Sequence, residues 1–334
     1  MRTVKVGITV QKRMNFNEVR TVLLKVEKEL NSILFGQEKV VKELLFAFFS
    51  QGHTLVEGLP GLGKTMLVKA LAKTFSLTFK RIQFTPDLMP ADVTGTHLLI
   101  EKEGMREFVF MKGPIFSHLL LADEINRATP KVQSALLEAM QERTVTAGET
   151  TYSLPNPFFV VATQNPIEME GTYPLPEAQL DRFSLKIIIP FPDLNTLKRI
   201  GVETSPYTEP NVKEVGDEIL LREVVSFIEL MPVAPEVVSY ASRLVLATHP
   251  EGDLAPFEVR KFVRYGVSPR GVQVLLRVGK VKAMLEDRPN LSFSDIQEVA
   301  YPALRHRLIL NYEGEADKVG YDSLIEKVVE RVKI

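Results

Sequence analysis

Apolar residues follow two different spacings in the first half of the chain, and the changes between them predict alternating helices and strands. Spacings of three and four residues predict amphipathic helices over residues 17–30 and 37–49, each with one apolar face. Short continuous apolar runs are typical of strands buried in a sheet. Such runs occupy residues 54–56, 117–122, 158–162 and 185–189, and residues 79–84 also read as a strand. Strands that alternate with helices predict an α/β fold with a parallel, doubly wound sheet.

Three further segments alternate between apolar and polar residues, which is the period of a half-buried strand. Residues 98–110 alternate around Glu101-Lys102-Glu103-Gly104, and residues 144–152 alternate around Gly148, so each segment predicts a β-hairpin. Residues 1–10 also alternate and predict a short strand, and they lack the long apolar core of a signal peptide.

The pattern changes at Pro190-Phe191-Pro192, beyond which the spacing is helical and no strand is predicted. Residues that start helices occur at Ser268-Pro269 and at Ser294-Asp295. Helices are predicted over residues 219–229, 235–248, 270–286, 294–308 and 321–332. We therefore predict a domain boundary near residue 192, between an α/β domain and an all-helical domain.

Composition narrows the classes of protein that remain. The 334 residues exceed one ordinary core and favour about two domains. The net charge of −1 gives no general attraction to nucleic acid or to an anionic membrane. Without cysteine, disulfides, thiolate catalysis and cysteine-ligated zinc are excluded, and the five histidines show no paired ligand spacing. No apolar run reaches about 18 residues, so we expect no membrane insertion and a cytoplasmic location.

One stretch carries a specific chemical motif. Gly58-Leu59-Pro60-Gly61-Leu62-Gly63-Lys64-Thr65 fits the phosphate-binding pattern G-x-x-x-x-G-K-[ST], between a predicted strand and a helix that starts at Met66. Glycines let backbone N–H groups turn towards a phosphate, and the helix start adds further donors. We expect residues 58–66 to bind ATP, with Lys64 at the β- and γ-phosphates and the Thr65 hydroxyl on Mg²⁺. A glycine-rich turn that matches by chance is the less favoured alternative.

A pair of carboxylates follows the apolar run at residues 117–122. Asp123 and Glu124 end the segment Leu119-Leu120-Leu121-Ala122, and the carboxyl ends of parallel strands are where α/β sheets bind ligands. We expect Asp123 to hold Mg²⁺ and Glu124 to orient and deprotonate the attacking water. The alternative is that the pair caps the helix predicted over residues 130–142, but the preceding phosphate-binding motif favours the catalytic interpretation.

Several longer strings resemble the AAA+ ATPases, and within that class the chain is similar to the MoxR group. The strings are 53–65, Ala122-Asp123-Glu124-Ile125-Asn126-Arg127-Ala128, 135–142, Ala162-Thr163-Gln164-Asn165-Pro166, 175–183, Ser268-Pro269-Arg270 and Leu304-Arg305-His306-Arg307. The resemblance implies an AAA+ core, a P-loop NTPase parallel sheet, over residues 17–192 and an all-helical lid domain over residues 193–334. Residues 1–16 have no counterpart in it and form an N-terminal extension.

The resemblance also implies roles for four polar residues, and the bare sequence leaves an alternative open for three of them. Asn165 would be the sensor that helps Glu124 hold the water, or a turn residue before proline. Arg182 would be an arginine finger for the neighbouring subunit, or a cation at a helix C-terminus. Arg270 would be a lid residue that contacts the γ-phosphate of its own chain, and Gln37 would contact adenine or simply start a helix.

The activity implied is Mg²⁺-dependent ATP hydrolysis that drives chaperone-like remodelling or activation of partner proteins. The working form would be a homo-oligomer, a hexameric ring, and the protein clients would carry a von Willebrand factor A domain in many cases. The two hairpins would point towards the ring pore and the clients, unless they are ordinary exposed turns.

Two other functions share this core. A nucleic-acid motor of the helicase or clamp-loader type is disfavoured by the net charge, although basic clusters occur over residues 260–264 and 305–307. A metal-chelatase motor subunit carries similar hairpins, but the lid strings fit the MoxR group better. We therefore expect no nucleic-acid partner.

Overall fold

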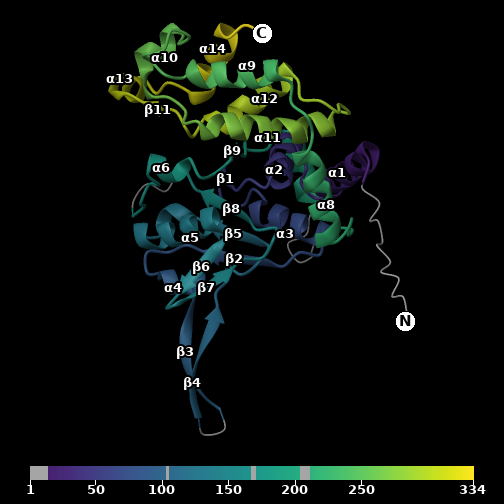
Figure 1. Cartoon of the computed structure of the whole chain (residues 1–334), viewed down its shortest axis with the longest axis vertical. Helices are drawn as coiled ribbons and strands as arrows, with labels where there is room; N and C mark the ends of the chain where they lie inside the picture. Colours follow the sequence, from purple (N-terminus) through teal and green to yellow (C-terminus); the bar gives the residue numbers. More distant parts are fainter. Residues whose placement is uncertain (1–13, 103–104, 167–170, 204–210) are drawn as a thin grey trace, which may run out of the picture.

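A computed structural model describes residues 14–102, 105–166, 171–203 and 211–334 and shows an α/β core beneath a helical region (Figure 1). The core sheet has five parallel strands in the order β2-β5-β8-β1-β9. Their bounds are Phe79–Gln83, Leu119–Asp123, Phe159–Gln164, Thr54–Glu57 and Leu185–Ile188. Every apolar run predicted as a core strand is one of these strands, and the predicted parallel sheet is confirmed. The strand predicted over residues 1–10 lies outside the described residues.

Helices cover both faces of the sheet, and the strands distribute alternate side chains to the two faces. Leu119 and Leu121 of β5 pack in one apolar cluster with α1 (Phe16–Asn31), α2 (Glu38–Phe49) and α3 (Lys64–Thr74). Leu120 and Ala122 pack in a second cluster, with α4 (Pro90–Thr94) and α5 (Pro130–Glu142). Burial on both faces explains why β5 and β8 read as continuous apolar runs instead of alternating ones.

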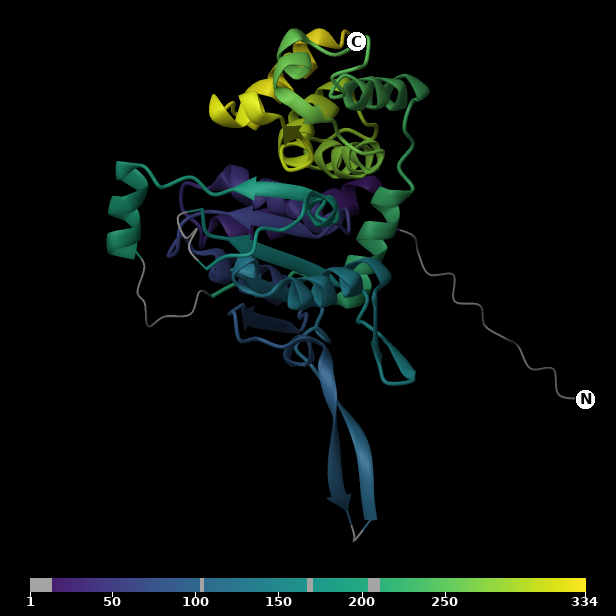
Figure 2. The same cartoon turned by 90° about the vertical axis from the view of Figure 1, so that its left-hand side faces the viewer.

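Two antiparallel hairpins leave the core. The strands β3 (Gly95–Lys102) and β4 (Met105–Lys112) pair through eight residue pairs and project away from the helical region (Figure 2). β6 (Thr144–Ala147) and β7 (Thr150–Ser153) form the shorter hairpin, in which Gly148 has φ +63°. Tyr152 stacks on Phe110 with ring centroids 4.4 Å apart, so the shorter hairpin braces the base of the longer one.

The second half is mainly helical, as predicted, with one exception. α6 (Glu177–Leu180) precedes β9. The helices that follow β9 in the chain are α7 (Leu194–Glu203), α8 (Glu218–Glu229), α9 (Pro235–Leu246), α10 (Phe257–Phe262), α11 (Arg270–Leu285), α12 (Phe293–Leu304), α13 (Tyr312–Ala316) and α14 (Tyr321–Arg331). Val263–Tyr265 (β10) pairs antiparallel with Ile309–Leu310 (β11), so the prediction of no strand here was wrong. Segments of two or three residues are too short to establish a period of their own. Among the described residues, no helix is long and apolar enough to cross a membrane.

The helical region is fixed to the core by a short basic segment after α12. Arg305 donates from Nη1 to the Lys186 carbonyl oxygen over 3.2 Å, and His306 Nε2 donates to the Phe183 carbonyl oxygen over 2.9 Å. Arg307 Nε donates to Asp181 Oδ1 over 2.8 Å. Burial holds the pKa of His306 well below its usual range, so the ring is neutral and serves the packing.

Candidate nucleotide-binding site

The glycine-rich loop lies between β1 and α3, as its motif requires. β1 ends at Glu57 and α3 begins at Lys64. Gly61 and Gly63 have φ values of +81° and +79°, the left-handed region that residues with a side chain rarely adopt. A Cβ at Gly58 would lie 3.0 Å from the Ile189 side chain, so the start of the loop is also tightly packed. The loop therefore has the backbone form in which N–H groups can surround a phosphate.

Lys64 connects the loop with the acidic pair. Its Nζ donates to the Gly58 carbonyl oxygen over 2.7 Å, across the loop. Burial lowers the pKa of Lys64, and the charges of Asp123 and Glu124 act in the opposite direction. β1 and β5 both pair in parallel with β8, so the loop after β1 and the acidic pair at the end of β5 lie at the same edge of the sheet.

The acidic pair is held in place by Thr163 of β8. Thr163 Oγ1 donates to Asp123 Oδ1 over 2.5 Å and accepts from the Glu124 backbone N–H over 2.9 Å. Glu124 has φ +57°, a left-handed conformation that costs free energy in a residue with a side chain. The Thr163 hydroxyl, which donates one hydrogen bond and accepts another, therefore fixes the turn that carries the two carboxylates at the end of β5.

Two residues of β2 also contact the acidic pair, and neither was identified from the sequence. Arg81 donates from Nε and Nη2 to Asp123 Oδ2 over 3.1 and 2.7 Å. Gln83 Nε2 donates to Glu124 Oε2 over 2.7 Å. The available signal was a pair of polar residues two apart on a predicted strand. This spacing did not indicate which residues Arg81 and Gln83 contact, because the sequence did not predict that β2 pairs with β5.

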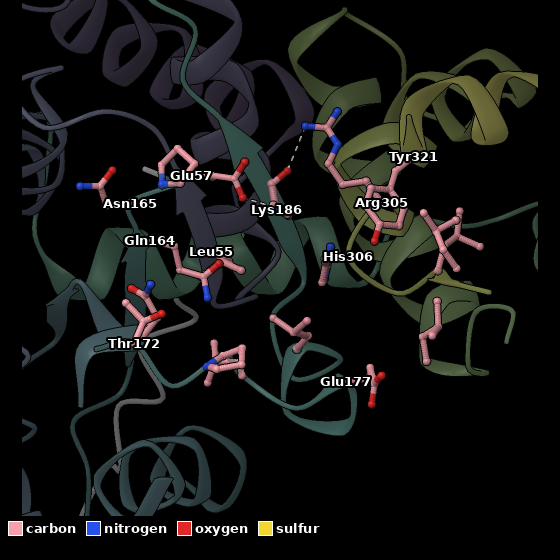
Figure 3. A pocket seen from close by; sticks show the side chains of 18 of the residues that line it. Leu55, Glu57, Gln164, Asn165, Thr172, Glu177, Lys186, Arg305, His306 and Tyr321 are labelled. Atoms are coloured by element: carbon pink, nitrogen blue, oxygen red, sulfur yellow. Dashed lines mark hydrogen bonds and ion pairs between the residues drawn. The ribbon is translucent and has the colours of Figure 1, made fainter. Parts of the chain in front are cut away.

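Asn165 follows β8 directly and lies at the same edge of the sheet. It is 7% exposed and lines a cavity of about 350 Å³ between the core and the helical region (Figure 3). Glu57 and Lys186 lie between Asn165 and Arg305 in this view, and Lys186 Nζ is 2.7 Å from a Glu57 carboxylate oxygen. The predicted sensor residue is therefore next to the strand that leads into the phosphate-binding loop.

Arg182 and Arg270 lie at the opposite edge of the sheet. Arg182 precedes β9, where the Ser184 N–H donates to the His53 carbonyl oxygen at the start of β1 over 2.7 Å. Arg270 Nη1 lies 3.4 Å from Asp181 Oδ2, and both arginines line one cavity of about 150 Å³. That cavity has no lining residue from the loop 58–65.

Arg270 lies near Asp181 in this structure, and its predicted contact with the γ-phosphate of its own chain stays a prediction. The structure brings Arg270 to Arg182 and Asp181, at the edge where the strands begin. The physical reason is the position of the helical region, whose basic segment anchors it to residues 181–186. The first turn of α11 therefore lies beside the segment that precedes β9.

Gln37 immediately precedes α2 and has an unusual environment. Its side chain is 5% exposed, and its Oε1 atom is buried without a hydrogen-bond partner among the described residues. An orphaned buried acceptor costs free energy unless a ligand satisfies it, and the amino group of an adenine is a donor. This atom is consistent with the predicted contact between Gln37 and adenine.

The donor set also fits Mg²⁺ bound with a nucleotide. Mg²⁺ in such sites is held by one or two protein oxygens together with phosphates and water. Thr65 and Asp123 supply a hydroxyl and a carboxylate close to the loop. A metal cage made only of protein is not expected, and the described residues contain no group of three histidines or carboxylates that could form one.

Comparison with known proteins agrees with this geometry. A family model for the ATPase family associated with various cellular activities (AAA) matches residues 53–185, and a model for the AAA lid domain matches residues 258–328. Chaperone MoxR1 of Mycobacterium tuberculosis is 41% identical over 315 residues, covering 92% of this chain and 80% of the relative. Protein MoxR of Methylorubrum extorquens is 31% identical over 331 residues, covering 94% and 95%. A crystal structure from Cytophaga hutchinsonii, described as a candidate ATPase, superposes with a TM-score of 0.88 at 41% identity over 96% of each chain.

The fold, the phosphate-binding loop and the lid define a AAA ATPase. Within this class the chain belongs to the MoxR family, as its relatives cover most of its length. The predicted fold class, family and ATPase activity are confirmed, and ATP is accordingly its nucleotide. The roles of individual residues, the domain boundary near residue 192 and the requirement for Mg²⁺ stay predictions.

Proposed function

We propose that this chain hydrolyses ATP with Mg²⁺ and uses the energy to remodel or activate partner proteins in a chaperone-like manner. The observation that carries the proposal is the convergence of Lys64, Asp123 and Glu124 at one edge of the sheet. A loop lysine beside a fixed pair of carboxylates matches the requirements of phosphoryl transfer to water, in which positioning and charge neutralisation supply most of the rate.

Each residue of this edge has a distinct task in the proposal. Lys64 exchanges its hydrogen bond with Gly58 for the β- and γ-phosphates, and Gln37 holds the adenine. Mg²⁺, held by Thr65 and Asp123, supplies charge neutralisation at the phosphates. Glu124 orients the attacking water and accepts its proton, and Asn165 holds that water or the γ-phosphate by a hydrogen bond.

Arg182 and Arg270 then act together on a neighbouring subunit. Both line a cavity at the other edge of the sheet, which no residue of the loop 58–65 lines. A cation at that edge reaches a phosphate only if a second copy presents its loop there, which is a head-to-tail contact. Repetition of this contact closes into a ring, and six subunits is the number that the resemblance implies.

The remodelling role rests on the relatives and on the exposed hairpin. One relative is named a chaperone, and Phe108 at 71% and Leu99 at 51% exposure are apolar side chains on the hairpin that a protein client could cover. A client with a von Willebrand factor A domain is the class that we propose. A nucleic-acid motor and a metal-chelatase motor remain alternatives, but no described feature favours either one.

Two substitutions separate binding from hydrolysis. Lys64→Ala removes the cation that faces the phosphates, so a fluorescent ATP analogue should lose tight binding. Glu124→Gln keeps the loop intact, so the analogue should bind normally while the turnover number falls by at least about 10²-fold. Lys131→Ala and Glu138→Gln on the exposed face of α5 are matched controls that should change neither measurement.

The same variant tests the role in remodelling. Glu124→Gln should hold ATP for long periods and retain client proteins that the wild type releases, and mass spectrometry of co-purified proteins would identify them. Near wild-type turnover in Glu124→Gln would remove Glu124 as the base. Stimulation of hydrolysis by DNA instead of protein would favour the nucleic-acid motor.

A further inference from the structure

The edge strand β2 aims two polar side chains at the acidic pair. Arg81 and Gln83 are two residues apart, so they project from the same face of the strand. The parallel register places Gln83 opposite Asp123, at the end of β5. As an outer strand, β2 has no neighbour beyond it in the core sheet, and the Arg81 side chain is 47% exposed. The two side chains therefore reach the active edge from its solvent side.

Both oxygens of Asp123 have protein partners. Oδ1 accepts from Thr163 over 2.5 Å, and Oδ2 accepts from Arg81 Nε and Nη2 over 3.1 and 2.7 Å. A guanidinium that donates twice to one oxygen occupies the position from which that oxygen would bind a metal. Mg²⁺ and an arginine cation cannot share it, because two positive charges at that distance repel each other.

The hydrogen bonds continue from Arg81 to the second carboxylate. Arg81 Nη2 also donates to Gln83 Oε1 over 2.9 Å, and Gln83 Nε2 donates to Glu124 Oε2 over 2.7 Å. Gln83 thus connects the counter-ion of Asp123 to the proposed base. Glu124 Oε2 also accepts from Arg127 Nη1 over 3.1 Å, so Glu124 keeps a donor that does not depend on Arg81.

We propose that Arg81 is a resident counter-ion that competes with Mg²⁺ for Asp123. The proposal rests on the proposed function, in which Asp123 holds Mg²⁺. Arg81 is a positioning residue, since it acts on the reaction only through Asp123.

The strength of the contact suits such an exchange. The Asp123 side chain is 13% exposed, so a carboxylate left without any cation there would be poorly solvated. The arginine is half exposed, and exposed ion pairs are worth only about 0–1 kcal/mol. Arg81 therefore neutralises Asp123 in the absence of the metal. When Mg²⁺ binds, the ion pair can break at a small cost in free energy, because the guanidinium becomes hydrated.

The test compares the affinity for a fluorescent ADP analogue in EDTA and in saturating Mg²⁺. The ratio of the two affinities measures how strongly Mg²⁺ assists binding, without any hydrolysis. Arg81→Gln should raise this ratio by about fivefold, with the affinity in EDTA unchanged. Lys80→Gln is the matched control, since it removes the same charge from the next residue, on the opposite face of β2, and it should leave the ratio at the wild-type value.

A second measurement follows the Mg²⁺ concentration that gives half-maximal hydrolysis, which Arg81→Gln should lower by a similar factor. An equal or smaller ratio in Arg81→Gln than in Lys80→Gln, with both proteins folded by thermal unfolding, would overturn the proposal while leaving ATP binding intact. A loss of affinity in EDTA would also overturn it, because Arg81 would then bind the nucleotide itself. If the wild type binds no nucleotide in either buffer, the proposed function fails, and this proposal fails with it.

Discussion

At the scale of single residues, Glu43 of α2 is a carboxylic acid in an unfavourable place. It is 5% exposed, and burial raises its pKa to about 7, although Arg305 and Lys39 act in the opposite direction. Its nearest cation is Lys39 Nζ at 4.0 Å. Arg305 comes from the segment that anchors the lid, so the charge state of Glu43 bears on the contact between lid and core.

The pH dependence of stability follows from this shift. The folded-state pKa lies above the ordinary value of 4.5, so the native state keeps a proton that the unfolded chain has released between these pH values. The stabilisation is fully present below about pH 4.5 and is lost as the pH rises through about 7. Glu43→Gln cannot titrate. Its free energy of unfolding relative to the wild type should therefore increase by about 1–3 kcal/mol from pH 5 to pH 8.

Denaturant titration at several pH values measures this difference. Glu138→Gln, on an exposed position of α5, is the control and should keep a constant difference from the wild type. A constant difference for Glu43→Gln as well would show that Glu43 is ionised in the native state across the whole range.

At the scale of elements, the apolar pattern was sufficient for the strands and most helices but not for their arrangement. The run at residues 119–121 predicts a buried strand because both faces are covered. Nothing in it says that β2 and β8 are its neighbours, since pairing depends on contacts between distant segments. Arg81, which contacts Asp123 across β2 and β5, could not be identified for that reason.

The candidate site divides in the same way. The loop 58–65 and the pair Asp123 and Glu124 were predictable because each is a local motif whose chemistry lies in adjacent residues. The position of Arg270 was not, because it depends on how the lid sits on the core. Pairing of β10 with β11 was missed for the related reason that two short segments, 44 positions apart or more, form one unit only after folding.

The longer hairpin allows a matched comparison of two phenylalanines on its β4 strand. Phe110 stacks on Tyr152 with centroids 4.4 Å apart, whereas Phe108 is 71% exposed. Phe110→Ser should loosen the base of the hairpin and speed proteolysis within residues 95–112 by about threefold or more, since an aromatic pair is worth about 0.5–1.5 kcal/mol beyond its buried area. Phe108→Ser should leave the rate of proteolysis unchanged. When it is combined with Glu124→Gln, it should weaken the retention of client proteins that Glu124→Gln shows alone. Equal proteolysis of the two variants would contradict the bracing role of Tyr152.

At the scale of the whole molecule, the proposed assembly implies that each subunit presents one half of a catalytic site at either edge of its sheet. Under the proposed assembly, Arg182→Ala keeps its own loop and disables its neighbour's site. Glu124→Gln disables its own site and keeps its finger. Each variant alone should be nearly inactive, since a finger can contribute about 10³–10⁵ in rate.

Mixing the two variants should restore part of the activity, because some junctions then combine an intact loop with an intact finger. ATPase activity across mixing ratios, under conditions where subunits exchange, measures this recovery. Arg270→Ala should behave like Arg182→Ala in the same assay, given that both line one cavity. No recovery despite demonstrated exchange would rule out Arg182 as a finger in trans.

The longer hairpin is also a long, narrow projection from the core. Eight residues per strand at about 3.4 Å each give an arm of about 27 Å. Its base is tightly packed, since a Cβ at Gly95 or Gly113 would lie 2.3 Å from the carbonyl oxygens of Met111 and Val93 respectively. If the arm turns with its base as one body, a tilt of about 10° would carry the far end of the paired strands through about 5 Å. A small rotation at the base would therefore move the far end of the arm by more than the length of one residue.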